Sequence, residues 1–270
     1  MKIARMLFSV FLLLAALPAS AKVDWTDVWY DPAEPGWGIN LVQSDAFMYG
    51  TFYIFDAAGK PTWYAAQMTW DQARLEFVGP LYLPAGTGYQ YPWRQGDVSV
   101  TQVGTASFKP TQGGISVSYK GTLRYTFTDT GLTVTKPVER ITLTQIYLGG
   151  SFTGGQYGEY YDCPSSADNY TYTDPFDLEV THDGSSVRMD FTYRSGTCTL
   201  TGTLEQHGSL YRINGASYRC SNGLNTTATV YDLKSGSLGI EGRLYASSAG
   251  AGCKEAAKFA GVYSFGQAAQ

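Results

Sequence analysis

The chain has 270 residues, with 19 basic and 23 acidic side chains and an aromatic content of 15%. Without residues 1–21, which carry two basic residues and no acid, the formal charge is −6. Because Lys and Arg are scattered among acids and form no basic patch, the composition argues against a nucleic-acid partner.

Residues 1–21 have the pattern of a secretory signal peptide. A basic start at Lys2 and Arg5 is followed by an apolar run over 6–17 and a small-residue exit that ends at Ala21. We expect cleavage after Ala21 and a periplasmic or secreted protein. The apolar run is too short to span a bilayer, and no later segment is apolar enough to cross as a helix, so we expect no stable membrane insertion.

Tryptophan and cysteine divide the remaining chain into two parts. All six tryptophans lie before residue 100, whereas all four cysteines lie after residue 160. The change falls near the glycine pair at 149–150. We therefore predict a tryptophan-rich β-barrel-like domain over 22–148 and a cysteine-containing one over 149–270.

Apolar residues alternate with polar ones throughout, in runs bounded by Gly, Asp, Asn and Pro, which is typical of sandwiches and barrels. The predicted fold class is all-β, with two consecutive antiparallel meander or barrel-like lobes. In the first lobe we expect strands over 36–43, 46–55, 61–70, 74–82, 101–109, 114–120, 122–128 and 132–145. In the second we expect them over 150–160, 176–182, 186–194, 197–206, 208–220, 226–233, 237–247 and 257–265.

The cysteines of an exported chain are expected to form two disulfides, because the compartments outside the cytoplasm are oxidising. In an eight-stranded up-and-down meander all four fall at one rim of the second lobe. Cys198 and Cys220 then meet across one hairpin. Cys163 and Cys253 become neighbours only if the sheet closes, so we predict Cys198–Cys220 and Cys163–Cys253 among the three pairings that four cysteines allow.

The densest motif begins at Pro35-Gly36-Trp37-Gly38-Ile39-Asn40 and ends at Gly59-Lys60-Pro61-Thr62-Trp63-Tyr64. This PGWGxN and GKPTWY pattern resembles an uncharacterised β-rich module of secreted bacterial proteins. The resemblance covers about residues 25–145, and the second lobe is similar to the cysteine-containing companion of that module. It implies export and a β-fold, and it supplies no catalytic residue.

The motif also suggests a binding site, since aromatic faces beside amides suit sugars and small apolar ligands. In the alternative interpretation the rings form the core and the amides cap turns. Loop 83–100, with three further aromatic residues at Tyr89, Tyr91 and Trp93, is a second candidate contact surface. The predicted ligand-binding residues are Trp37, Asn40, Gln43, Tyr53, Trp63 and Tyr64.

No catalytic constellation stands out. His182 and His207 both lie in or beside expected turns, the cysteines are expected to be bridged, and no metal-ligand or phosphate-binding spacing occurs. We therefore predict no metal, no cofactor and no enzymatic activity. A hydrolase remains an alternative, because four carboxylates are expected near one rim of the second lobe: Glu159, Asp162, Asp174 and Asp177.

The leading hypothesis is an exported, non-enzymatic binding or interaction module whose partner is a small ligand, a glycan or an envelope protein. A structural or adhesion-type scaffold is the main alternative. An outer-membrane barrel is a lesser one, because alternation alone does not say whether the apolar face meets a core or lipid.

Overall fold

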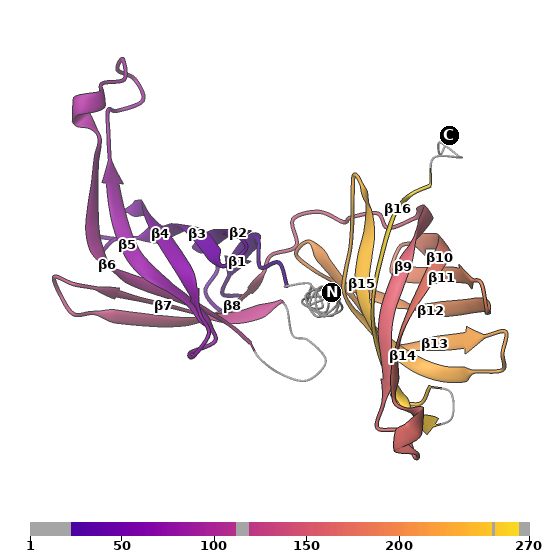
Figure 1. The fold of residues 1–270 in the computed structure, drawn as a ribbon. Helices are drawn as coiled ribbons and strands as arrows, with labels where there is room; N and C mark the ends of the chain where they lie inside the picture. The colour runs from indigo at the N-terminus through magenta and orange to yellow at the C-terminus, as the bar shows by residue number, and fades with distance from the viewer. Residues whose placement is uncertain (1–22, 112–118, 250–251, 265–270) are drawn as a thin grey trace, which may run out of the picture.

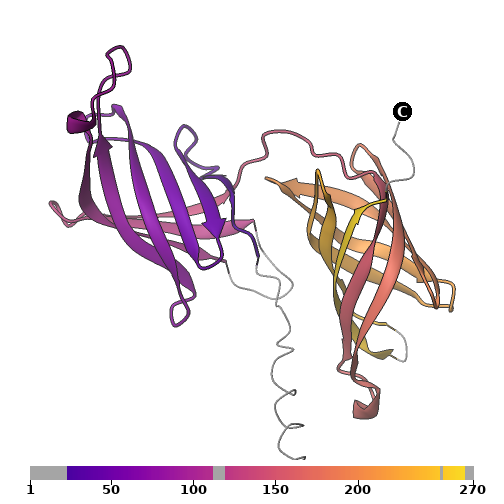
Figure 2. The same cartoon turned by 45° about the horizontal axis from the view of Figure 1, so that its top comes forward.

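The computed structural model describes residues 23–111, 119–249 and 252–264, and these residues form two consecutive closed barrels of eight antiparallel strands each (Figures 1 and 2). The expected all-β class and two-lobe plan are confirmed. Each strand pairs with its neighbours in sequence, and the last strand of each barrel returns to the first. Within the described residues, no helix is both long and apolar enough to cross a membrane.

The first barrel closes where β1 meets β8, through the pairs Trp29 with Arg140 and Tyr30 with Glu139. Its strands are β1 (Asp27–Tyr30), β2 (Gly38–Ser44), β3 (Phe47–Phe55), β4 (Pro61–Asp71), β5 (Glu76–Ala85), β6 (Ser99–Pro110), β7 (Lys120–Phe127) and β8 (Thr133–Arg140).

Two expectations for the first barrel need correction. Strand β1 was not predicted, because its four residues are too few to show a clear alternation. The expected strand over 132–145 ends at Arg140, since the following residues leave the barrel and contact the second lobe. Most of the expected strand over 114–120 lies outside the described residues.

The second barrel follows the predicted strands closely and closes where β16 pairs with β9. Its alternation is regular: Val187 and Met189 point inward, whereas Arg188 points outward. One difference is that β10 begins at Tyr170, six residues before the expected start. Its strands are β9 (Gly150–Tyr161), β10 (Tyr170–Asp183), β11 (Ser186–Tyr193), β12 (Gly196–His207), β13 (Leu210–Cys220), β14 (Asn225–Gly236), β15 (Gly239–Ala246) and β16 (Lys254–Tyr263).

Both predicted disulfides are present. Cys198 lies opposite Cys220 in the β12–β13 hairpin, and the two are bonded. Cys163 follows β9 and Cys253 precedes β16, and closure of the barrel brings this second pair together. The four cysteines therefore lie at one rim, as the meander argument required.

Each barrel has its own apolar core. In the first, Ile39, Phe52, Met68 and Phe108 pack around Trp29. Trp25, Trp37 and Trp70 are partly buried and pack against this core, whereas Trp63 and Trp93 are exposed. Aliphatic, methionine and phenylalanine side chains supply most of it.

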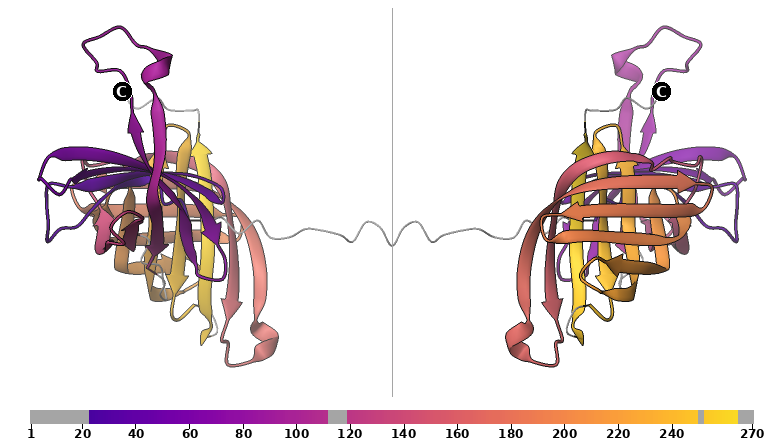
Figure 3. Two further views of the ribbon diagram at one scale, coloured as in Figure 1. Left: turned by 90° about the vertical axis from the view of Figure 1, so that its left-hand side faces the viewer. Right: turned by 90° about the vertical axis from the view of Figure 1, so that its right-hand side faces the viewer.

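Two segments extend beyond the barrel walls. The β5–β6 hairpin continues past the rim of the first barrel, with a short 3-10 helix η1 (Gln95–Asp97) in its loop (Figures 1 and 3). The connection over 141–149 runs along the second barrel, where Leu148 enters the core. Two surfaces are candidates for a functional site: the outer face of β2–β4 and the junction between the lobes.

Candidate functional site

Two of the predicted ligand-binding residues lie side by side on the outside of the first barrel. Tyr53 on β3 pairs in register with Trp63 on β4, and their side chains are 57% and 47% exposed. Asn40 on β2 points to the same side. It lies two residues from Gly38, which pairs with Tyr53, and alternate residues of a strand point to the same face. These three residues form one surface.

The other three predicted residues lie elsewhere. Trp37 and Tyr64 pack against the first core from the inner side of the wall. The Gln43 side chain holds the N-terminal segment, since its Oε1 accepts a hydrogen bond from the Trp25 backbone N–H at 2.9 Å. The structure therefore divides the six residues between the two sides of the barrel wall, and they do not share one pocket.

The outer surface of β2–β4, which we call the aromatic face, carries an unusual number of exposed apolar side chains. Neighbouring strands bring them together, and the amides of Asn40 and Gln67 lie among them. Between Gly38 and Thr69, no outward-pointing position of these three strands is charged. The exposed apolar residues are Val42, Phe47, Tyr49, Tyr53, Phe55 and Trp63.

The projecting hairpin continues from one side of the aromatic face. Tyr82 on β5 pairs with Ala65, two residues from Trp63, and β5 then leaves the wall toward the loop. There Tyr89, Tyr91 and Trp93 are all exposed, as expected for a contact surface, and Trp93 is 70% exposed. Aromatic side chains thus extend from the wall of the barrel to the tip of the hairpin.

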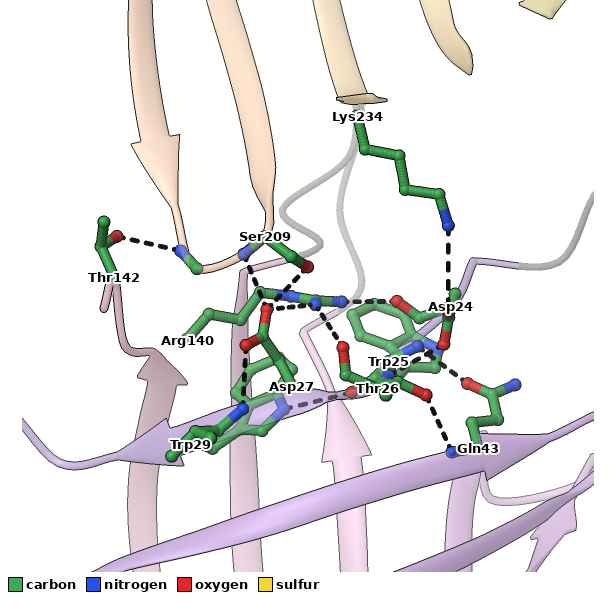
Figure 4. Close-up of polar contacts among 12 residues, drawn as sticks. Asp24, Trp25, Thr26, Asp27, Trp29, Gln43, Arg140, Thr142, Ser209 and Lys234 are labelled. Carbon is green, nitrogen blue, oxygen red and sulfur yellow. Dashed lines mark hydrogen bonds and ion pairs between the residues drawn. The ribbon is translucent and has the colours of Figure 1, made fainter. Parts of the chain in front are cut away.

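A buried ion pair of the first lobe lies at the junction with the second (Figure 4). The side chain of Arg140 is completely buried and donates to the Asp27 carboxylate at 2.9 Å. It also donates to the backbone carbonyls of Asp24 and Thr26, and it lies over the Trp29 ring. Burial lowers the pKa of Arg140, and the hydrogen bond and charge of Asp27 oppose that shift. Asp27 is therefore the counter-ion that allows an arginine to be buried here.

The second lobe contacts this ion pair through the turn between β12 and β13. Asp27 Oδ2 accepts hydrogen bonds from both the backbone N–H and the hydroxyl of Ser209, each at 2.9 Å (Figure 4). Gly208 has a φ of +64°, and a Cβ at this position would lie 2.4 Å from Asp27 Oδ2 and 2.7 Å from Arg140 Cβ. Only glycine fits this close approach. Next to it, His207 stacks on Tyr119 of the first lobe, with ring centroids 3.7 Å apart.

A groove of about 800 Å³ lies between the lobes. Thr26 and Asp27 form its first-lobe side, and Ser209, the β14–β15 hairpin and outward-facing residues of β9 and β16 form the other. Leu238 and Val262 are exposed at 82% and 62%. Lys234 in this groove lies 2.9 Å from Glu241 and 3.7 Å from Asp24, while Asp27 is paired with Arg140.

The histidines have structural contacts. His182 accepts a hydrogen bond at Nδ1 from the Leu148 backbone N–H, and its Nε2 lies 2.8 Å from the Gly184 carbonyl. It therefore fixes the interlobe connection to β10. Burial lowers the pKa of His207, with Glu205 and Glu139 opposing the shift and Arg212 and Lys120 adding to it.

The four carboxylates on which the hydrolase alternative depended do not share a pocket. Glu159 and Asp177 point outward on β9 and β10, and Asp177 accepts a hydrogen bond from Thr153. Asp162 lies in the loop after β9 and pairs with Lys254 at 2.8 Å. Asp174 is on β10, half-buried. Among the described residues, no cluster of His, Cys, Asp or Glu is arranged to hold a metal ion.

A buried polar cluster inside the second barrel was not predicted. Glu255 is 2% exposed and accepts hydrogen bonds from Tyr172 and from Gln156, which in turn accepts one from Tyr193. The second carboxyl oxygen, Oε2, has no hydrogen-bond partner among the described residues. Burial raises the pKa of Glu255, and the Tyr172 hydrogen bond opposes that shift. The sequence does contain a sign of this cluster. Glu255 lies two residues before Ala257 and four before Phe259, so a glutamate occupies a position of β16 that points into the barrel.

Comparisons with known proteins identify no family for this chain, so its class is defined by its fold alone. The chain matches no protein-family model and no curated protein sequence. A crystal structure of a "putative outer membrane protein" from Bacteroides fragilis aligns over 87% of this chain and 94% of its own, with 10% identity and a TM-score of 0.33. That degree of likeness carries no argument about function.

Proposed function

We propose that the protein is an exported, non-enzymatic binding module that holds a neutral glycan on the aromatic face of its first barrel. The observation that carries the proposal is the pair of exposed rings at Tyr53 and Trp63, beside the amide of Asn40, in the part of the face between Gly38 and Thr69 that carries no outward charge. An aromatic ring covers the apolar side of a sugar, while an amide bonds its hydroxyls. A charged ligand would find no complementary group between these strands.

Export is supported by the two disulfides and by the signal-peptide pattern of residues 1–21. The direction of the side chains in the second barrel supports a lobe that works in water. Its apolar side chains point inward, while charged residues such as Arg188 and Asp190 point outward. A membrane-spanning barrel would carry its apolar residues on the outside.

A role in binding without catalysis is supported by the use of the reactive side chains. All four cysteines are bonded and both histidines hold structural contacts. Of the four carboxylates, Glu159 and Asp177 face outward, Asp162 pairs with Lys254, and Asp174 is half-buried on β10. A protein-interaction scaffold is a second candidate, favoured by the three exposed aromatic residues on the projecting hairpin.

A glycan array probed with the mature protein tests the proposal. We expect binding to neutral glycans, and loss of that binding in Trp63→Ala and Tyr53→Ala. Leu132→Ala is a matched control, since Leu132 is 56% exposed on the β7–β8 turn, outside the aromatic face. Binding that survives both aromatic substitutions, or that is lost equally in the control, would contradict the proposal.

A further inference from the structure

The aromatic face and the interlobe groove are connected along one row of the first barrel. Asp27 pairs with Leu41, and Val28 pairs with Asn40, so Thr26 lies beside Val42 at the end of β1. The Gln43 backbone N–H donates to Thr26 Oγ1 at 2.9 Å, which fixes this neighbourhood. Val42 in turn pairs with Tyr49 on β3, and Tyr49 with Gln67 on β4.

Thr26 adjoins the aromatic face in this row and also lines the groove. From Thr26 the row crosses the exposed side chains of Val42 and Tyr49, and the Tyr53–Trp63 pair lies four residues farther along β3 and β4. Neighbouring strands lie about 4.8 Å apart and residues about 3.4 Å apart along a strand, so the path runs about 14 Å across the strands and about 14 Å along them. The groove then extends it onto the second lobe.

The groove shares with the face its exposed apolar side chains and its uncharged polar groups. Its exposed apolar side chains, Leu238 and Val262, stand beside hydroxyl groups from Ser209 and Ser235 and from Thr153. Four charged residues also line it: Asp27 is paired with Arg140, and Lys234 is shared by Glu241 and Asp24. Such a surface suits a neutral ligand that presents both apolar faces and hydroxyls.

We infer that the interlobe groove is a second subsite for the same ligand, and that this ligand is a linear neutral polysaccharide whose chain lies across both lobes. The inference rests on the proposed function of the aromatic face and adds the length of the ligand and the part played by the second barrel. The docked lobes hold the two subsites at a fixed distance, and only a chain of several sugars reaches both.

Chain-length dependence tests this inference. The probes are short and long oligomers of cellulose-type and amylose-type glucans, measured by calorimetry on the full mature chain. The groove variant is Leu238→Ser with Val262→Ser, two exposed positions where a polar residue does not disturb a core. The face variant is Trp63→Ala, and Leu132→Ser is the control for loss of an exposed apolar side chain.

We expect the groove variant to weaken binding of the long oligomers by about tenfold and to leave the short ones unchanged. We expect the face variant to weaken both. Two results would overturn the inference: equal binding of long and short oligomers by the wild type, or a groove variant that binds like the control at every length. In either case the proposed function still stands if Trp63→Ala loses binding. Failure of the wild type to bind any glucan overturns the inference as well. Saturable self-association that Trp63→Ala abolishes in sedimentation, without glucan binding, would assign the face to a second copy of the chain and overturn both.

Discussion

Replacing Gly208 with alanine tests whether the two barrels are docked through the β12–β13 turn. A methyl group at this position meets Asp27 Oδ2 at 2.4 Å and Arg140 Cβ at 2.7 Å, both in the first lobe. These atoms belong to an ion pair whose arginine is completely buried, and moving Arg140 away would break its hydrogen bonds to Asp24, Thr26 and Asp27. The turn must therefore shift, and Ser209 then loses its two hydrogen bonds to the Asp27 carboxylate.

The magnitude follows from two separable terms. Alanine in the left-handed region costs about 1–2 kcal/mol wherever it occurs. Each hydrogen bond to a charged group contributes about 1.5–3 kcal/mol, so the loss of two weakens docking by about 3–6 kcal/mol. Gly184→Ala isolates the first term, because Gly184 has a φ of +57° in the β10–β11 turn of the same barrel and a Cβ there meets nothing within 4 Å.

Small-angle scattering and urea unfolding together provide the assay. All six tryptophans lie in the first lobe, so tryptophan fluorescence follows that lobe alone, while far-UV circular dichroism follows both. We expect Gly184→Ala to destabilise the second barrel and leave the radius of gyration unchanged. We expect Gly208→Ala to increase the radius of gyration. Identical scattering and unfolding for the two variants would refute docking through this turn.

Two further predictions concern the second barrel. Because burial raises the pKa of Glu255, the folded state favours the protonated carboxyl, so this group's contribution to stability is lost as the pH rises through the raised pKa. Glu255→Gln, which cannot ionise, should remove a slope of up to about 1.4 kcal/mol per pH unit from the unfolding free energy, and an unchanged slope by circular dichroism would count against a buried, titrating Glu255. Loss of a disulfide should cost more where the bridge closes the longer loop: about 4.5 kcal/mol for Cys163–Cys253, which spans 90 residues, and about 3.5 kcal/mol for Cys198–Cys220, which spans 22. Double-alanine variants compared by urea unfolding check this order, and the reverse order would show that loop entropy does not dominate.

The second barrel was predicted well because its apolar residues lie on one face of each strand only. Inward positions such as Val187 and Met189 are apolar, and outward positions such as Arg188 are charged, so the pattern itself indicates strand, face and rim. Barrel closure and both disulfides followed from that order. The late expected start of β10 reflects Asp174 and Pro175, two residue types that are depleted in strands.

The first barrel was harder because apolar residues occupy both sides of its wall. On β3, Phe52 and Ile54 point inward while Tyr53 and Phe55 point outward. The composition of such a strand does not say which set is the core, so a site was predicted from residues that the fold separates, Trp63 among them. The same ambiguity concealed the aromatic face, which depends on the register between strands.

The junction between the lobes could not be read from the sequence. Asp27 and Ser209 are 182 positions apart, and Asp27 and Arg140 are 113 apart, so no local pattern marks them as partners. Their association depends on the orientation of one closed barrel against another. The strand periodicity that predicted each barrel contains no information about that orientation.

The position of the bound glycan is tested most directly by the indole N–H signals of the six tryptophans in a nitrogen-15 spectrum of the mature protein. Trp63 is 47% exposed on the aromatic face and Trp29 is fully buried in the core, so the two report on the outer surface and the interior of one barrel. On titration with a long neutral glucan oligomer, we predict that the Trp63 signal shifts with saturation while the Trp29 signal stays in place. A glucan that binds and leaves the Trp63 signal unmoved would contradict the central claim.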